Sequence, residues 1–214
     1  MPKHLRRGIL ILAVLALAAA AGADEGLWLF DRLPSALLKA RYGFTMSDDW
    51  ALHVMYSSVR FGGASGSFVS PEGLVLTNHH VGQGALQSLS TKDRDLMKSG
   101  FYARTRAEEL KCPGLELTVL QEIEDVTAKV RGAEAADMTP AQAAAARDAA
   151  VARLEREAAE KTGLRCTVVT LYSGGMYHLY KYKVYTDVRL VFAPNTPWPS
   201  SAATRTTSPI PATI

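Results

Sequence analysis

Two adjacent histidines, His79 and His80, offer the clearest chemistry in this sequence. They follow two short apolar runs, 68–69 and 74–76, which are separated by a Ser-Pro-Glu-Gly turn. Proline and glycine at such places favour a tight turn, and the apolar runs on either side favour paired strands. Histidine is a common general base in catalysis, so this stretch predicts a β-hairpin that presents one. The alternative is a buried strand that precedes a capping Asn and two histidines without a chemical role.

The sequence predicts neither a metal site nor a cofactor. Adjacent strand residues point to opposite faces, which suits chelation by His79 and His80 poorly. No Cys-x-x-Cys or His-x-x-x-His spacing occurs. The two cysteines, Cys112 and Cys166, could form one disulfide in an exported protein, or they could remain two structural thiols. The residues alone leave both states open.

The first 23 residues have the layout of a secretory signal peptide. Lys3, Arg6 and Arg7 give a positive start, and 9–17 form an apolar core that is short for a membrane span. An Ala-Gly-Ala cleavage site ends at Ala23. We therefore expect cleavage after Ala23 and export to the periplasm or the medium, with an uncleaved anchor as the alternative.

The charges of the chain balance once this leader is removed. The sequence contains 24 Lys and Arg against 21 Asp and Glu, and the leader holds three of the basic residues and none of the acidic ones. A neutral mature chain predicts no nucleic-acid partner, and no membrane association is expected after cleavage. Tyrosines within 177–185 could offer a stacking surface, but their alternation with lysine favours a structural role in a half-buried strand.

Apolar periodicity predicts a mainly β fold with helices between the strands. We expect short helices at 34–39, at 48–55 with Ser47 as the N-cap, at 85–88 after a glycine loop, and at 91–97. Glycines within 62–66 indicate a turn or a place where the backbone approaches another strand or a substrate closely. Besides the two runs of the hairpin, strands are predicted at 57–61, 115–120, 165–172, 177–185 and 187–194.

One long helix interrupts this β pattern at 137–163. Thr139-Pro140 is typical of a helix start, 141–161 is rich in Ala, Glu and Arg without Gly or Pro, and Gly163 is typical of a helix end. Alanine and valine fill most of its apolar positions, so coiled-coil pairing is weakly supported. We interpret this segment as a solvated helical insertion in a β fold.

Several stretches, taken together, resemble the S46 family of exported bacterial dipeptidyl-peptidases. In chain order they are 58–61, 66–80, 100–103, 108–113, 162–166 and 185–194. The resemblance implies a chymotrypsin-like double β-barrel with an inserted α-helical domain. Residues 24–194 would then hold the first barrel only, together with part of the helical domain.

The resemblance also implies serine-type hydrolysis that releases dipeptides from oligopeptides with a free N-terminus, without a cofactor. His80 matches the catalytic histidine of the family, which takes the proton of the serine and returns it to the leaving amine. Val81 departs from the Cys that several members have there. The triad Asp and Ser have no match, and Asp187 lies before the segment that carries that Asp.

We therefore expect an N-terminal fragment that is inactive alone, whereas full-length relatives are expected to be homodimers. Two other classes stay open: a non-enzymatic exported binding module, and a trypsin-like endopeptidase completed by a partner chain. The residues that would set specificity for the side chain before the cleaved bond have no match in this sequence.

Residues 195–214 are rich in Pro, Ser, Thr and Ala without periodicity, which predicts an irregular segment. Codons chosen for 196–208 and read two bases later can encode Ala-Met-Ala-Phe-Phe-Gly-Gly-Asp-Pro-Asp-Asp-Phe. This shifted sequence resembles what the family has after its Phe-Ala-Pro strand. We hypothesise an out-of-frame tail from about Asn195, which the nucleotide sequence would confirm or refute.

Overall fold

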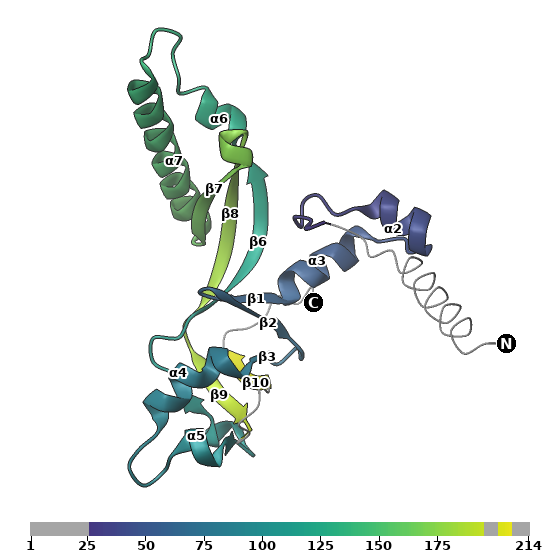
Figure 1. Ribbon diagram of the computed structural model, residues 1–214, viewed down its shortest axis with the longest axis vertical. Helices are drawn as coiled ribbons and strands as arrows, with labels where there is room; N and C mark the ends of the chain where they lie inside the picture. The colour runs from purple at the N-terminus through teal and green to yellow at the C-terminus, as the bar shows by residue number, and fades with distance from the viewer. Residues whose placement is uncertain (1–25, 195–200, 207–214) are drawn as a thin grey trace, which may run out of the picture. The chain divides into compact units, whose positions relative to one another are not determined.

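The structure is a computed structural model that describes residues 26–194 and the backbone of 201–206 (Figure 1). The chain divides into two compact units, Met1–Phe44 and Thr45–Ile214. In the first unit, helix α2 (Ser35–Tyr42) confirms the helix expected near 34–39 and ends at Gly43, which has a φ of 67°. The predicted signal peptide at 1–23 lies outside the described residues. None of the described helices has the length and apolar character needed to span a bilayer.

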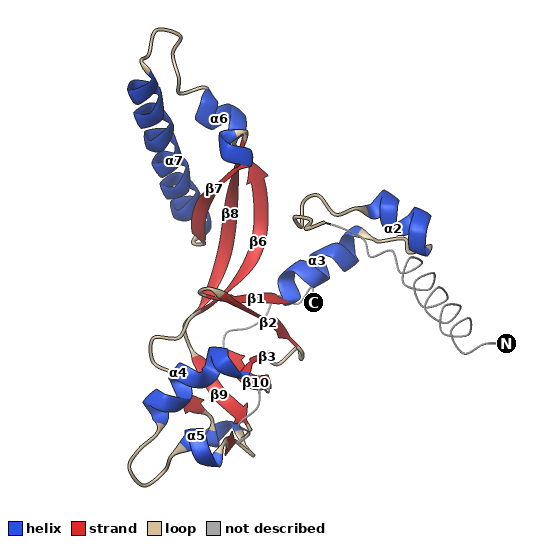
Figure 2. Ribbon diagram, viewed as in Figure 1, coloured by secondary structure: helices blue, strands red, loops and turns tan. Residues whose placement is uncertain are grey.

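The second unit combines helices with an antiparallel sheet (Figure 2). Its strands are β1 (Ser58–Phe61), β2 (Ala64–Phe68), β3 (Leu74–Asn78), β4 (Phe101–Tyr102), β5 (Leu110–Lys111), β6 (Leu117–Asp125), β7 (Arg165–Leu171), β8 (Met176–Tyr185), β9 (Val188–Ala193) and β10 (Ser201–Thr206). Its helices are α3 (Asp48–Ser57), α4 (His79–Leu89), α5 (Leu96–Ser99), η1 (Arg106–Glu108), α6 (Thr127–Arg131), α7 (Pro140–Thr162) and η2 (Tyr172–Gly174). The described strands form one sheet in the order β4-β9-β10-β3-β2-β1-β6-β8-β7, and β5 also pairs with β9.

The hairpin predicted around the Ser-Pro-Glu-Gly turn is confirmed. Strands β2 and β3 pair antiparallel, with Gly66 opposite Thr77 and Phe68 opposite Val75. The turn between them includes Gly73, whose φ of 84° favours glycine. The helix predicted after Ser47 is also confirmed, because the Ser47 hydroxyl accepts a hydrogen bond from the Trp50 N–H at 3.2 Å.

The long helical insertion is confirmed as α7, close to its predicted ends. Thr139 and Gln142 form a reciprocal capping box at its start, and Gly163 ends it with a φ of 69°. The helix is not solvated all round. Ala150 is buried, and Val151, Leu154 and Ala158 pack into a core cluster with side chains of α6, β7 and β8.

Between His80 and β4, the helical turn expected at 85–88 is confirmed as part of the longer α4, but two other expectations are wrong. The predicted glycine loop after His80 is helical, because α4 runs through Gly82 and Gly84 without a break. The predicted polar helix at 91–97 is shorter and starts later, because the carboxylate of Asp95 caps α5 by accepting hydrogen bonds from two backbone N–H groups. Tertiary packing of Leu86 and Leu96, each 1% exposed, outweighs local helix propensity here.

The prediction of an irregular segment at 195–214 is wrong for residues 201–206, which form β10. This strand pairs with β3 on one side and with β9 on the other. The backbone groups of β3 and β9 can form hydrogen bonds with a strand between them whatever its side-chain pattern is. The pattern of apolar residues in the sequence therefore did not predict β10. The remainder of that segment lies outside the described residues, and its reading frame stays a hypothesis.

Three hydrophobic clusters form the described core. The first contains Val59, Phe61, Phe68, Val75, Leu117, Val119, Tyr185 and Val188. The second contains Leu86, Leu96, Phe101, Ala103, Cys112, Leu190 and Ala193. The third contains Val126, Val130, Tyr177 and Leu179, with Cys166 packed against it.

The two cysteines do not form the disulfide that the sequence allowed. Both thiols are free, and they belong to different clusters, Cys112 to the second and Cys166 to the third. Burial raises the pKa of the Cys112 thiol, so this residue stays protonated and behaves as a small apolar side chain. The alternative of two structural thiols is the one that the structure shows.

Candidate active site

His79 and His80 open helix α4 directly at the end of strand β3. This corrects the expectation that both lie in a strand, where neighbours point to opposite faces. On a helix, successive side chains are turned by roughly 100° instead. His80 is exposed, whereas His79 is half-buried and its Nδ1 is buried without a hydrogen-bond partner in the described structure. The two residues therefore differ in exposure, and His80 is the more exposed of the two.

Strand β3 is fixed by close packing against β2. Val75 is fully buried in the first cluster, and the Thr77 hydroxyl donates to the Ser65 carbonyl at 2.8 Å. A Cβ on Gly66 would lie 2.8 Å from the carbonyl oxygen of Leu76, which is closer than packing permits. The close backbone approach predicted for this glycine segment is therefore confirmed at Gly66, where it brings β2 against β3.

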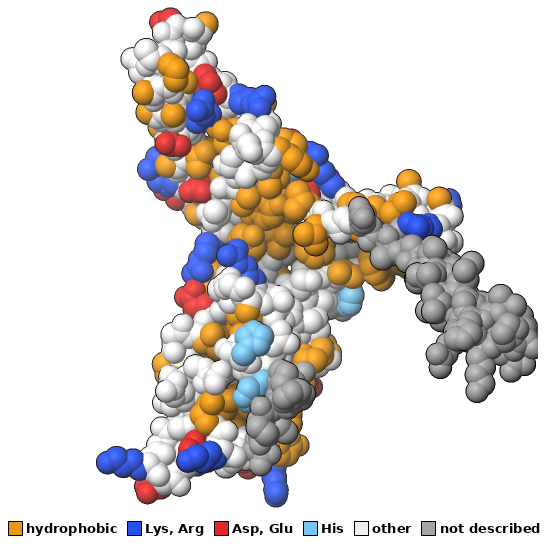
Figure 3. All heavy atoms as spheres, viewed as in Figure 1, with side chains coloured by type: hydrophobic (Ala, Val, Ile, Leu, Met, Phe, Trp, Pro, Cys, Tyr) orange, Lys and Arg blue, Asp and Glu red, His pale blue; other side chains and the backbone are white. Residues whose placement is uncertain are grey.

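Helix α4 is anchored at both ends, and this determines where His80 lies. Near its start, Val81 packs against the first cluster, and further along, Leu86 is buried in the second. At its end, the Ser90 hydroxyl donates to the Leu86 carbonyl at 2.8 Å and accepts from the Leu96 N–H at 3.0 Å. The space-filling view shows histidine side chains at the surface beside α4 (Figure 3).

An exposed imidazole of this kind is a suitable general base or general acid. Within residues 26–194, no carboxylate lies within ion-pair distance of His80, and Asp187 is engaged by the Arg189 guanidinium at 3.0 Å. Acyl transfer also needs a nucleophile and oxyanion donors. Among the described residues, His80 therefore has no carboxylate partner that could orient it for such a role.

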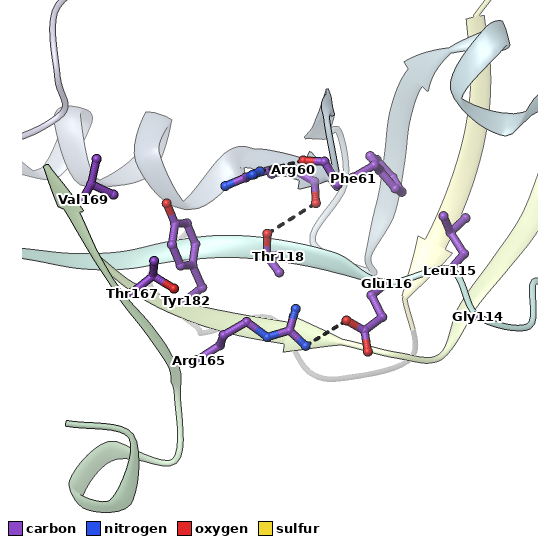
Figure 4. Close-up of a pocket in the computed structure, with 11 residues that line it drawn as sticks. Arg60, Phe61, Gly114, Leu115, Glu116, Thr118, Arg165, Thr167, Val169 and Tyr182 are labelled. Carbon is purple, nitrogen blue, oxygen red and sulfur yellow. Dashed lines mark hydrogen bonds and ion pairs between the residues drawn. The ribbon is translucent and has the colours of Figure 1, made fainter. Parts of the chain in front are cut away.

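Among the described residues, no group of three or more His, Cys, Asp or Glu side chains could hold a metal ion. A cavity of about 560 Å³, which the sequence did not predict, lies among β1, β6, β7 and β8 (Figure 4). A sequence signal for it exists in hindsight, because Arg165, Thr167 and Val169 alternate with the buried-face residues of β7.

Comparison with known protein families agrees with this geometry. The sequence model of the peptidase S46 family matches residues 23–198. Dipeptidyl-peptidase 7 from Porphyromonas gingivalis is 38% identical over 200 residues, and the match covers 88% of this chain and 28% of that protein. The Asp/Glu-specific dipeptidyl-peptidase of Porphyromonas endodontalis is 32% identical, with 86% and 27% covered. The chain thus spans less than a third of the length of these relatives.

Solved structures give the same result for the fold. The crystal structure of Porphyromonas endodontalis DPP11 in complex with the dipeptide Arg-Glu superposes with a TM-score of 0.69 at 29% identity, covering 86% of this chain and 30% of that one. DPP11 of the same organism in complex with Arg-Asp superposes equally well. Because the family match extends over most of the sequence, this chain belongs to the peptidase S46 family.

Proposed function

We propose that this chain is part of a serine-type dipeptidyl-peptidase and that His80 is its general base. The observation that carries the proposal is the exposed imidazole at the junction of β3 and α4. In this role, His80 takes the proton from a serine hydroxyl as that serine attacks the peptide carbonyl. It then gives the proton to the leaving amine, which carries away the shortened peptide.

The packing around the hairpin supports a chymotrypsin-like barrel. Strands β1, β2, β3 and β6 are consecutive in the sheet and contribute side chains to the first hydrophobic cluster, as do β8 and β9. We propose that this cluster is the core of the first catalytic barrel and that α6 and α7 belong to an inserted helical domain. The nucleophilic serine and the carboxylate that would orient His80 have no match in this chain.

The substrate class follows from the relatives. DPP11 of Porphyromonas endodontalis is known in complex with dipeptides. We propose oligopeptides with a free N-terminus as substrates, cleaved after the second residue. We also propose that residues 1–23 direct export and are cleaved after Ala23.

A fusion protein tests the role of His80. Residues 24–194 replace the aligned segment of the Porphyromonas gingivalis dipeptidyl-peptidase 7, and release of a dipeptidyl fluorophore is measured. We expect His80→Ala to lower kcat/KM by roughly a thousandfold or more, because no other group supplies the base. The matched control is His53→Ala, which removes another exposed histidine from α3 and is expected to leave kcat/KM unchanged.

Two further measurements define the activity. An oligopeptide with an acetylated N-terminus should not be cleaved by the fusion protein, and internal cleavage of it would indicate an endopeptidase instead. The 214-residue chain alone should release no fluorophore. Turnover by the chain alone that is lost in His80→Ala would show that its own residues complete the site, contrary to this proposal.

A further inference from the structure

The sheet face opposite α7 carries a cavity with charged and hydroxyl side chains in its lining, and His80 does not line it. Alternate residues of a strand point to opposite faces. On β7, Cys166 and Val168 pack into the third cluster with α7, whereas Arg165, Thr167 and Val169 line the cavity. The cavity is therefore built on the face of the sheet opposite α7, from side chains of β1, β6, β7 and β8 (Figure 4).

Strand register brings the polar residues of this cavity together. Arg60 of β1 is opposite Thr118 of β6, and Tyr182 of β8 is opposite Arg165 of β7. Figure 4 shows Arg60 extending to the side on which the Tyr182 hydroxyl lies, while Arg165 reaches along the sheet to Glu116. Two guanidinium groups and one carboxylate are the charged side chains of the lining, which leaves a net positive charge.

The two arginines differ in how much of their charge is compensated. The Arg165 Nη2 atom lies 2.8 Å from the Glu116 carboxylate, with the side chains 51% and 43% exposed. Such an exposed pair contributes little stability and exchanges partners readily. Arg60 donates from Nε to the Gly62 carbonyl at 2.7 Å, and no described carboxylate pairs with it. Among the charged side chains of the lining, Arg60 is therefore the cation whose charge no described carboxylate compensates.

The neighbouring hydroxyl group suits an acceptor ligand as well. Burial raises the pKa of Tyr182, and the charge and hydrogen bond of Arg60 offset this only in part. The phenol therefore stays protonated at neutral pH and can donate a hydrogen bond. A guanidinium fork beside hydroxyl donors is a preferred environment for a carboxylate.

We propose that this cavity binds the carboxylate of a short peptide, with Arg60 as the principal contact. Its volume of about 560 Å³ falls in the range of ligand sites. Leu115 and Val169 add apolar contact. This site goes beyond the proposed peptidase function and does not use His80.

Isothermal titration of the 214-residue chain with three peptides tests the proposal and identifies the carboxylate. The peptides are Ala-Ala-Ala, its C-terminal amide, and acetyl-Ala-Glu-Ala-amide, which has only a side-chain carboxylate. We expect the amide to bind at least about tenfold more weakly than one of the two carboxylate peptides. The stronger of those two shows whether the terminal or the side-chain group is recognised.

Two substitutions with opposite expected effects on peptide affinity make the test more specific. Arg60→Gln should weaken binding of the carboxylate peptide about tenfold, whereas Glu116→Gln should strengthen it several-fold because Arg165 loses its competing partner. The matched control is Arg156→Gln, which removes one positive charge from the exposed surface of α7. His80→Ala should leave binding unchanged, so failure of this site and failure of the proposed peptidase base are distinguishable.

Clear outcomes would overturn the proposal. These are the absence of binding by both carboxylate peptides, equal binding of the carboxylate and amide forms, or an equal effect of Arg156→Gln and Arg60→Gln, which would indicate general charge attraction. Circular dichroism of each variant confirms that its fold is kept. Amide chemical shifts of Thr118 and Thr167 locate the bound peptide, and shifts confined to other strands would also contradict the assignment.

Discussion

The hairpin that carries His80 and the region of α6, α7, β7 and β8 are stabilised in different ways. The first hydrophobic cluster joins Val59, Leu117 and Val188, residues that are far apart in the sequence. The third cluster, including the side chains packed against it, draws all its members from 126–179, a single continuous stretch. The catalytic candidate is therefore positioned by long-range contacts, and the helical region by local ones.

This difference explains why the two regions respond to different kinds of substitution. In the hairpin region, the backbones of β2 and β3 lie very close together. Substitutions that disturb this close fit are therefore expected to have the largest effect on stability. In the helical region, a helix cap and a partly exposed ion pair are expected to contribute about 1 kcal/mol or less each. The following predictions test this contrast, from the largest expected effect to the smallest.

Gly66→Ala should destabilise the chain by about 2 kcal/mol, because the new methyl group would lie 2.8 Å from the Leu76 carbonyl oxygen and force β2 away from β3. Urea unfolding followed by circular dichroism measures the change. Gly63→Ala is the matched control, because nothing lies within 4 Å of the added Cβ. Equal stability of the two variants would show that close approach of these strands does not limit the hairpin.

Thr139→Ala should cost about 1 kcal/mol, because it removes the side chain that caps α7. Hydrogen exchange should become faster at the start of α7 and stay unchanged in β2 and β3, which would separate the two regions directly. Thr105→Ala is the control, since Thr105 precedes η1 without a side-chain capping bond. Faster exchange in the hairpin as well would mean that the two regions unfold together.

The smallest effect concerns acid stability of the helical region. Hydrogen bonds from Lys129 and Lys181 lower the pKa of Glu124 below its ordinary value of 4.5. The stability from this group is present above the unfolded pKa and is lost as the pH falls through the folded pKa.

Glu124→Gln should therefore lower stability at pH 7 by less than about 1 kcal/mol and reduce the loss on acidification, since partly exposed pairs contribute little. Unfolding free energies at pH 7 and in the acid range measure both effects. Glu157→Gln serves as the control, because its pair with Arg153 is long, at 3.8 Å, and well exposed. A change in pH dependence that is the same in both variants would rule out a specific role for Glu124.

Local signals in the sequence were enough to predict several elements of the fold and the family of this protein. The Ser-Pro-Glu-Gly turn indicated the β2–β3 hairpin, and Thr139-Pro140 with Gly163 indicated α7 and its ends. The same residue strings were enough to indicate the S46 family and to single out His80. Turns, caps and periodicity act over a few neighbouring residues, so they can be read without the fold.

Only the tertiary structure decided the remaining features. Helix α4 begins at His79 because Val81 and Leu86 pack into separate clusters, although Gly82 and Gly84 favour a loop. Strand β10 forms because β3 and β9 leave a place between them, and the cavity at Arg60 exists because four strands align in register. These features depend on residues that are distant in the chain, so their free energy is not encoded in any local pattern.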